Sequence, residues 1–266
     1  FVDKFVAIVK MGLVAGLAIA FVSINKAMKF EAIEDSFKGL IRTWGTDAPA
    51  ALDAFRLAAK GTVSDLDLLT AANNALLLNS VDSVPQFGKL IEAGRRLGKA
   101  MGRTAAEGLS DLTIGIGRQS RLVLDNLGII VRTEAAYQTY AESLGKTVSA
   151  MDDAEKRAAF LAAAMKGIDD RLGKLGPETQ TFTDIWNQFK TEIENTAVAI
   201  GQIFLPVLKE LLPKLKKIVT GIKDWLSANS VNLAEKLSSA MSGIVKWLGK
   251  VGDFIEGNGL ADFFRQ

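Results

Sequence analysis

The chain contains no cysteine and no histidine among its 266 residues. Without cysteine, disulfides and thiolate metal sites are excluded, and the redox compartment cannot be inferred. Without histidine, the chain lacks the commonest general base and the commonest transition-metal ligand. Catalysis would have to rest on Lys, Asp, Glu or Ser placed by the fold alone. We therefore predict no enzyme activity and no cofactor.

The chain also lacks an excess of charge of one sign, because its 32 Lys and Arg nearly balance its 30 Asp and Glu, and the net charge is +2. This balance argues against a sequence-wide electrostatic attraction to nucleic acid. There are only five prolines, the hydrophobic share is 48% and the mean hydropathy is +0.19. No strong alternating strand pattern is present, so the predicted class is mostly α.

Three regions follow from the distribution of apolar residues and turn signals. Residues 1–38 form an apolar N-terminal helix, residues 39–176 a compact helical core module, and residues 177–266 long amphipathic helices. The chain begins with Phe1 rather than Met, which we interpret as the sign of a piece of a longer protein. The predicted fold is a multi-helix module with glycine-rich turns, followed by long amphipathic helices that self-associate.

The N-terminal apolar run has two interpretations. The uncharged stretch between Lys10 and Lys26 is shorter than the roughly 20 residues that a bilayer-spanning helix needs. Gly12, Gly16 and Ala20 lie four apart on one helix face, where another backbone can approach closely. Tight packing inside a protein and insertion into a membrane are both consistent with this pattern.

Helix starts in the core module carry capping signals. Ser64 followed by Asp67, and Thr104 followed by Glu107, both fit the capping-box spacing. Ser83 precedes Pro85, which is tolerated in the first turn of a helix.

Two more helices are expected after the glycine-rich centre of the chain, residues 108–129. We predict one from a Thr133 cap to Leu144 and another from Ser149 and Asp152 to about Lys166. A loose connection should follow, marked by three glycines and ending at Pro177; these are Gly167, Gly173 and Gly176.

Four glycines punctuate the centre of the chain, at Gly108, Gly115, Gly117 and Gly128. A glycine in a helix interior costs about 1 kcal/mol relative to alanine, so this density argues against one free-standing helix. We expect either a compact turn or backbones packed in close contact. A dinucleotide-binding turn is not supported, because Ser120 occupies the place of the third small residue and no strand precedes it.

This central stretch, residues 108–129, is followed by residues 135–148 and by an Asp-Ala-Glu-Lys-Arg helix start at Asp153. In this order of elements the chain resembles the core region of tail tape-measure proteins of long-tailed bacteriophages. The resemblance extends more loosely over roughly residues 5–215. The resemblance lies in the general character of the sequence and in the order of its segments, and it includes no catalytic signature.

Charged candidates have both a functional and a structural interpretation. Arg95, Arg96, Lys99 and Arg103 form a local basic patch that could contact phosphates, non-specifically at most, or could be a solvated helix face. The pairs Asp152–Asp153 and Asp169–Asp170 could bind Mg²⁺ but fit ordinary structural roles. We predict no metal site.

The helices after Pro206 place lysines opposite an apolar face. An earlier stripe runs from Phe182 to Ile200, and Pro206 is expected to interrupt or kink it. The pattern fits self-associating helices or interfacial membrane helices. The residues that form this face are Leu208, Leu211, Leu212, Leu215, Ile218, Ile222, Trp225 and Trp247.

The resemblance implies a virion protein held in the lumen of the tail tube, where its length determines tail length during tail assembly. Implied partners are copies of itself as a trimer or hexamer, the tail-tube and tail-tip proteins, and the host membrane during genome ejection. The alternative from another class is a pore-forming, helical toxin-like membrane protein.

Overall fold

The structure is a computed structural model and describes residues 22–228 of the chain. Two compact units divide the chain, and each is treated by itself. One is Ser23–Gly201, which we call the body; the other contains residues 202–228 of the described chain. No strand occurs within residues 22–228, so the prediction of a mostly α fold is confirmed.

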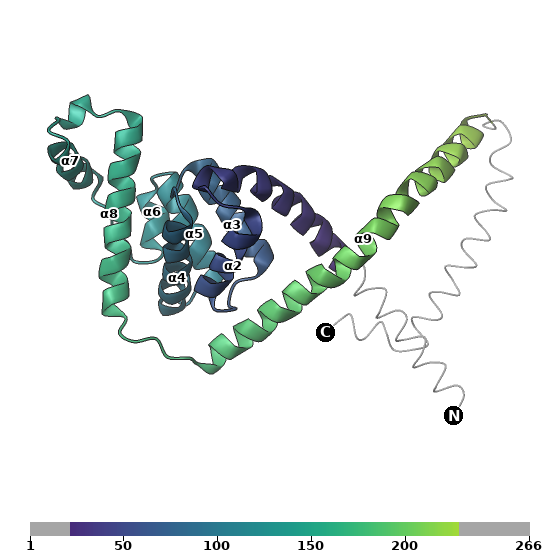
Figure 1. Cartoon of the computed structure of the whole chain (residues 1–266), viewed down its shortest axis with the longest axis horizontal. Coiled ribbons are helices and arrows are strands. Elements are labelled where there is room, and N and C mark those ends of the chain that lie inside the picture. Colours follow the sequence, from purple (N-terminus) through teal and green to yellow (C-terminus); the bar gives the residue numbers. More distant parts are fainter. Residues whose placement is uncertain (1–21, 229–266) are drawn as a thin grey trace. The chain divides into compact units, whose positions relative to one another are not determined.

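The described chain begins with a helical segment over residues 22–40, which is followed by shorter helices and then by two long helices (Figure 1). They are η1 (Ile41–Trp44), α2 (Ala48–Ala59), α3 (Asp65–Leu78), α4 (Val84–Ala100), α5 (Ala105–Gly117), α6 (Arg121–Asp125), α7 (Thr133–Ser143), η2 (Val148–Ala150), α8 (Asp153–Lys174) and α9 (Phe182–Ala228). We call residues 23–174 the bundle.

Helix starts follow the capping residues of the sequence with some differences. Ser64 accepts a hydrogen bond from the Asp67 backbone N–H, and Thr104 forms a complete capping box with Glu107. Ser83 precedes α4 but makes no side-chain cap bond.

Two predicted helix starts need correction. Helix α8 is capped by Asp152 with Glu155 rather than by Ser149. Thr133 is the first helical residue of α7, after an Arg132 cap that makes no side-chain bond.

The core of the bundle centres on three fully buried phenylalanines. Phe37, Phe55 and Phe87 come from segment 22–40, α2 and α4. The ring centroids of Phe55 and Phe87 lie 4.7 Å apart and those of Phe37 and Phe55 6.0 Å apart, both edge to face. Such pairs add to the free energy of simple burial, so this cluster joins three elements that are distant in sequence.

Helices α4 and α5 cross with their backbones in contact. A Cβ atom built on Gly94 would lie 2.5 Å from the Leu109 backbone N, and one on Gly108 would meet the Gly94 carbonyl. Only glycine permits this approach. Gly115 and Gly117 also lie inside α5, where a Cβ would meet Leu124 and Leu78.

Of the two expectations for the central glycines, close packing therefore describes Gly108, Gly115 and Gly117, and a turn does not. Gly128 lies in a turn with φ of +70°.

Helix α8 packs against α4 and α5 on one side and against α7 on the other (Figure 1). It runs to Lys174, so the prediction that this helix ends near Lys166 is wrong. Gly167 and Gly173 are helical, because a single glycine costs a helix too little to end it where neighbouring turns pack well. The real connection is residues 175–181, which we call the strap.

Helix α9 continues through Pro206 and Pro213. Pro206 therefore does not interrupt the helix, and the alternative expectation of a kink stays a prediction. Each proline removes one backbone donor and crowds the preceding turn, yet the helical turns on both sides are maintained.

Candidate functional site

The outward side of α9 within the body carries large apolar side chains. Between 51% and 79% of each is exposed, and they are Phe182, Ile185, Trp186, Phe189 and Ile193. Trp186 and Phe189 contact each other, with ring centroids 5.7 Å apart. The predicted apolar stripe is present, but it faces away from the bundle. We call these five residues the outer stripe.

The inward side of the same helix is mostly polar. The Gln188 side-chain N–H donates to the Lys60 carbonyl at 2.9 Å, and the Asp65 backbone N–H donates to Asn195 Oδ1 at 3.0 Å. Within the described part of α9, only Val198 belongs to the buried core cluster. An amphipathic helix normally turns its apolar face to the core, and here that orientation is reversed.

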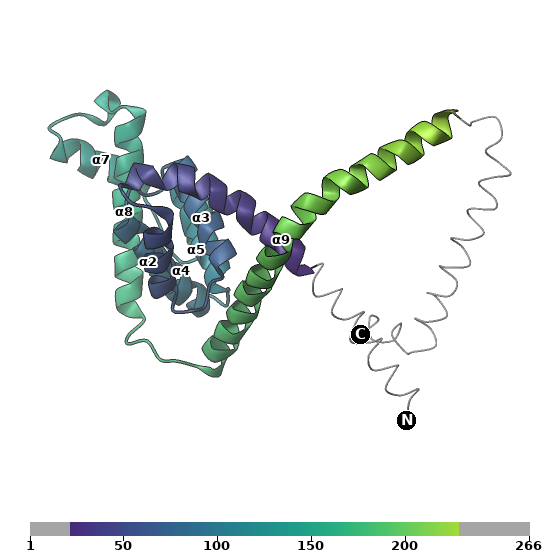
Figure 2. The same ribbon diagram turned by 45° about the vertical axis from the view of Figure 1, so that its right-hand side comes forward.

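Near residue 201, α9 crosses segment 22–40, as Figure 2 shows. A Cβ on Gly201 would lie 2.6 Å from the Ala27 Cβ and would clash with the Ser23 carbonyl. Lys26 lies 3.7 Å from Glu194 beside this crossing. The crossing therefore depends on a glycine in α9, as the α4–α5 contact depends on glycines.

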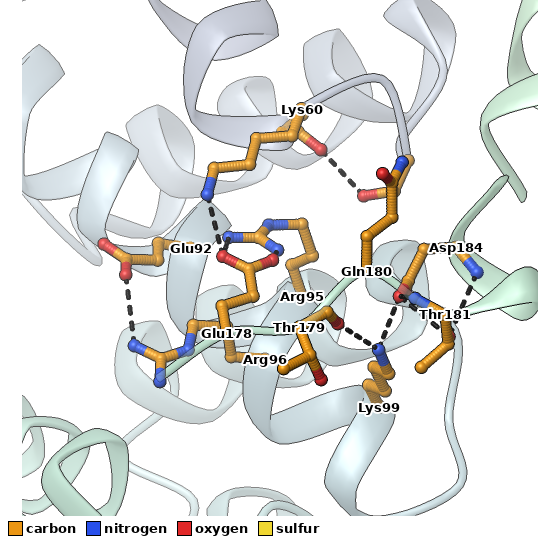
Figure 3. Close-up of polar contacts among 12 residues, drawn as sticks. Lys60, Glu92, Arg95, Arg96, Lys99, Glu178, Thr179, Gln180, Thr181 and Asp184 are labelled. Atoms are coloured by element: carbon orange, nitrogen blue, oxygen red, sulfur yellow. Dashed lines mark hydrogen bonds and ion pairs between the residues drawn. The ribbon is translucent and has the colours of Figure 1, made fainter. Parts of the chain in front are cut away.

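The strap is held on the bundle by charged groups (Figure 3). The Arg95 guanidinium donates two hydrogen bonds to the carboxylate of Glu178, and Lys60 Nζ lies 2.7 Å from that carboxylate. Arg95 is 8% exposed, so its charge is largely removed from water. A two-pronged guanidinium–carboxylate pair is the strongest geometry available to such groups.

A second set of contacts is made by Lys99 and Arg96 of α4. Lys99 Nζ lies 2.5 Å from Asp184 and donates to the Thr179 carbonyl at 3.4 Å. Arg96 donates to the Gly176 carbonyl at 2.8 Å. We call the contacts of Lys60, Arg95, Arg96 and Lys99 with residues 176–184 the latch.

Electrostatics keep the Asp184 carboxylate charged. Burial alone would raise its pKa, but hydrogen bonds from Lys99 and from the backbone and hydroxyl of Thr181 lower the pKa to about 2. A lowered folded-state pKa stabilises the fold fully above the unfolded value of about 3.9, and this contribution is lost as the pH falls toward 2. Burial lowers the pKa of Arg95, against the opposing effect of Glu92.

The predicted basic patch is thus engaged by the chain itself. Arg95 and Lys99 contact carboxylates of the strap and α9, while Arg103 lies 3.0 Å from Asp111 in α5. Arg96 contacts Glu92 at 3.4 Å as well as the strap. In this conformation the patch joins elements of the body, and contact with phosphate stays a prediction.

The acidic pairs have structural places. Asp152 and Asp153 lie at the start of α8, and Asp169 lies 2.6 Å from Lys89. No group of three or more Asp or Glu within residues 22–228 is arranged to hold a metal ion.

The second unit contributes the far half of α9. Leu208 is half-buried, whereas Leu211, Leu212, Ile218 and Ile222 are exposed. Leu215 and Trp225 belong to the same helix. Gly12, Gly16, Ala20 and Trp247 lie outside the described residues.

Among the described helices, one is long and apolar enough to cross a membrane by length and composition. It is α9 over Phe182–Asp224, and 17% of its most apolar window is buried.

Sequence reasoning missed Lys60, Glu178, Asp184, Gln188 and Asn195. A signal was present, because polar residues recur at positions 184, 188, 191 and 195 with the same three-to-four spacing as the aromatic stripe. Two parallel stripes of opposite character indicate a helix with two contact faces.

Comparison with protein families, with curated proteins and with solved structures finds no significant match for this chain.

Proposed function

We propose that this chain is a segment of a phage tail tape-measure protein, in which α9 associates with copies of itself through the outer stripe. The observation that carries the proposal is the outer stripe itself, which lies on an extended helix and is exposed to solvent. Residues 182, 186, 189 and 193 are spaced alternately four and three apart, and residues 200, 203 and 207 continue this register with Thr196 between them. Alternating spacing of this kind is the seam of a coiled coil.

The resemblance to tape-measure proteins supplies the biological setting. A helix advances about 1.5 Å per residue, so the length of a helical chain inside a tube converts directly into tube length. The glycine crossings and capping boxes of the bundle make the body a folded module within such a ruler rather than part of a uniform rod.

Self-association is tested by sedimentation equilibrium of the full chain over a wide concentration range. Replacing Trp186 and Phe189 together by Gln should shift the chain toward monomer, because polar groups then occupy the seam. Leu122→Gln is the matched control, since Leu122 is 85% exposed on α6 and lies outside the stripe. Equal association of all three proteins would remove α9 as the contact.

The ruler is tested in a phage that encodes this chain. In-frame deletion of residues 202–222 removes three heptads and keeps the register on both sides. Tails should shorten by roughly 30 Å, at about 1.5 Å per residue. Infectious particles with unchanged tail length would contradict the tape-measure proposal while leaving self-association standing.

A pore-forming, toxin-like membrane protein is the second candidate, and the span-length apolar helix α9 favours it. Release of dye from anionic liposomes by the chain alone, at concentrations where it is monomeric, would support this candidate over the ruler. Tight self-association without any dye release would contradict it.

A further inference from the structure

We propose that the strap and its latch hold the first half of α9 on the bundle reversibly, and that breaking the latch frees residues 182–195 while the bundle stays folded. The inference rests on the contacts of the body and does not depend on the proposed function. Figure 3 shows its main groups, with Arg95 and Lys99 facing the carboxylates of Glu178 and Asp184.

The first half of α9 contributes little apolar area to the core. Over residues 182–195 no side chain of α9 belongs to the buried core cluster, Thr191 is buried, and the ion pairs and hydrogen bonds to the bundle come from Asp184, Gln188, Glu194 and Asn195. The outer stripe is exposed while α9 is docked. Docking therefore gains little from the hydrophobic effect, which is the dominant favourable contribution to most helix packing.

The apolar core of the bundle is built from residues 30–168, and Val198 is its one member from the described part of α9. Phe37, Phe55 and Phe87 are fully buried and contact one another in two ring pairs, and α8 packs against α4 and α5. Residues 182–195 contribute no side chain to this core cluster, so we expect the cluster to persist when they are released. The bundle therefore has its own source of stability, and the docked helix does not supply it.

The ion pairs of the latch differ in strength because their cations differ in exposure. Lys60 and Lys99 are 58% and 41% exposed, and exposed pairs of this kind contribute little on their own. Arg95 is different, because its buried guanidinium needs a partner and is costly to leave unpaired. Its Nε atom is buried without a hydrogen-bond partner in this structure. The Arg95–Glu178 pair is thus the strongest single contact of the latch.

The first half of α9 is attached to the rest of the body near each of its two ends. The latch lies at the start of α9, while the close glycine crossing with Ser23 lies at Gly201. Between them α9 contacts the bundle through hydrogen bonds of Gln188 and Asn195 and through the ion pair of Glu194 with Lys26, at 3.7 Å. Once the latch is broken, the start of α9 separates, and the crossing at Gly201 stays as the remaining attachment.

The experiment measures the distance between a spin label on the bundle and one on α9 in the full chain. The chain has no native cysteine, so Ala50→Cys in α2 and Lys190→Cys in α9 give two unique, exposed attachment sites. An excess of unlabelled chain suppresses distances between copies. The parent should give one narrow distance, and Glu178→Gln with Asp184→Asn should lose it in favour of a broad distribution.

Two further variants sharpen the result. Asp169→Asn removes an ion pair between α8 and Lys89 of α4, away from the strap, and should keep the narrow distance. Lys60→Met with Lys99→Met breaks the latch from the bundle side, where neither side chain is buried, and should lose part of the narrow distance.

Thermal unfolding followed by circular dichroism shows whether the bundle survives. The proposal expects latch variants to keep the bundle transition of the Asp169→Asn control. It is overturned if the narrow distance persists in both latch variants. It is also overturned if the distance is lost only together with the bundle transition, because α9 would then be an integral part of the core.

Discussion

In the bundle the largest side chains point inward, whereas along the first half of α9 they point outward. Phe55 and Phe87 are completely buried, while more than half of Phe189 is exposed. Polar groups show the reverse, since Gln188 and Asn195 face the bundle from α9. Burial of apolar side chains therefore holds the bundle together, whereas polar contacts attach the first half of α9 to it.

The difference also separates two kinds of stability. Burial of apolar area and close backbone packing are not weakened by charge screening, while ion pairs near the surface weaken as ionic strength rises. On our proposal, the bundle of such a chain stays folded while the first half of α9 is released from it. Variants that affect one region and leave the other unchanged test this division.

The largest expected effect comes from the aromatic core. Phe87→Ala should lower the free energy of unfolding of the bundle by about 3–5 kcal/mol. The substitution removes apolar area that is buried away from water, and it leaves a cavity beside Phe55 and Trp44. Phe189→Ala, the same substitution on α9, should change it by less than about 1 kcal/mol. Urea titration followed by circular dichroism measures both. Similar losses for the two would erase the distinction between the regions.

A smaller effect is expected where α4 and α5 touch. Alanine at Gly94 would normally improve a helix by about 1 kcal/mol. Here its Cβ would lie 2.7 Å from the Leu109 Cα, so the helices must separate, and we expect a net loss of about 1–3 kcal/mol.

Gly173→Ala in α8 is the matched control for this change. Nothing lies within 4 Å of the added methyl, and the variant should be neutral or up to about 1 kcal/mol more stable. If both alanine variants were equally stable, the close crossing of α4 and α5 would not exist in solution.

How far the sequence predicts this fold depends on the range of each interaction. The caps at Ser64 and Thr104 were predictable because donor and acceptor lie within one turn. The density of glycines predicted either a compact turn or close packing, and it did not show that Gly94 is the partner of Gly108. That pairing is set by the crossing of two helices, which spacing along one helix does not encode.

The latch shows the same limit more clearly. The basic patch on α4 is visible in the sequence, but its partner Glu178 lies 83 residues from Arg95. Local charge counts therefore suggested an external anion or solvent where the chain supplies its own carboxylate. The sequence left open whether Pro206 interrupts the helix or only kinks it, because a proline's cost is local while the rest of α9 determines whether the helix continues.

The smallest effect separates two serine and threonine caps that look alike in sequence. Thr104→Ala should lower the free energy of unfolding by about 1 kcal/mol. The Thr104 hydroxyl accepts a hydrogen bond from the Glu107 backbone N–H, and the Glu107 carboxylate accepts one from the Thr104 backbone N–H. Ser83→Ala should be close to neutral, since the Ser83 side chain makes no cap bond at the start of α4.

The two variants share a urea titration, in which only the Thr104 variant should move the midpoint. Both caps precede helices that meet at the Gly94–Gly108 crossing, so each midpoint reports on the same bundle. An equal shift for both would mean that the residue type at a cap matters more than the bond it makes.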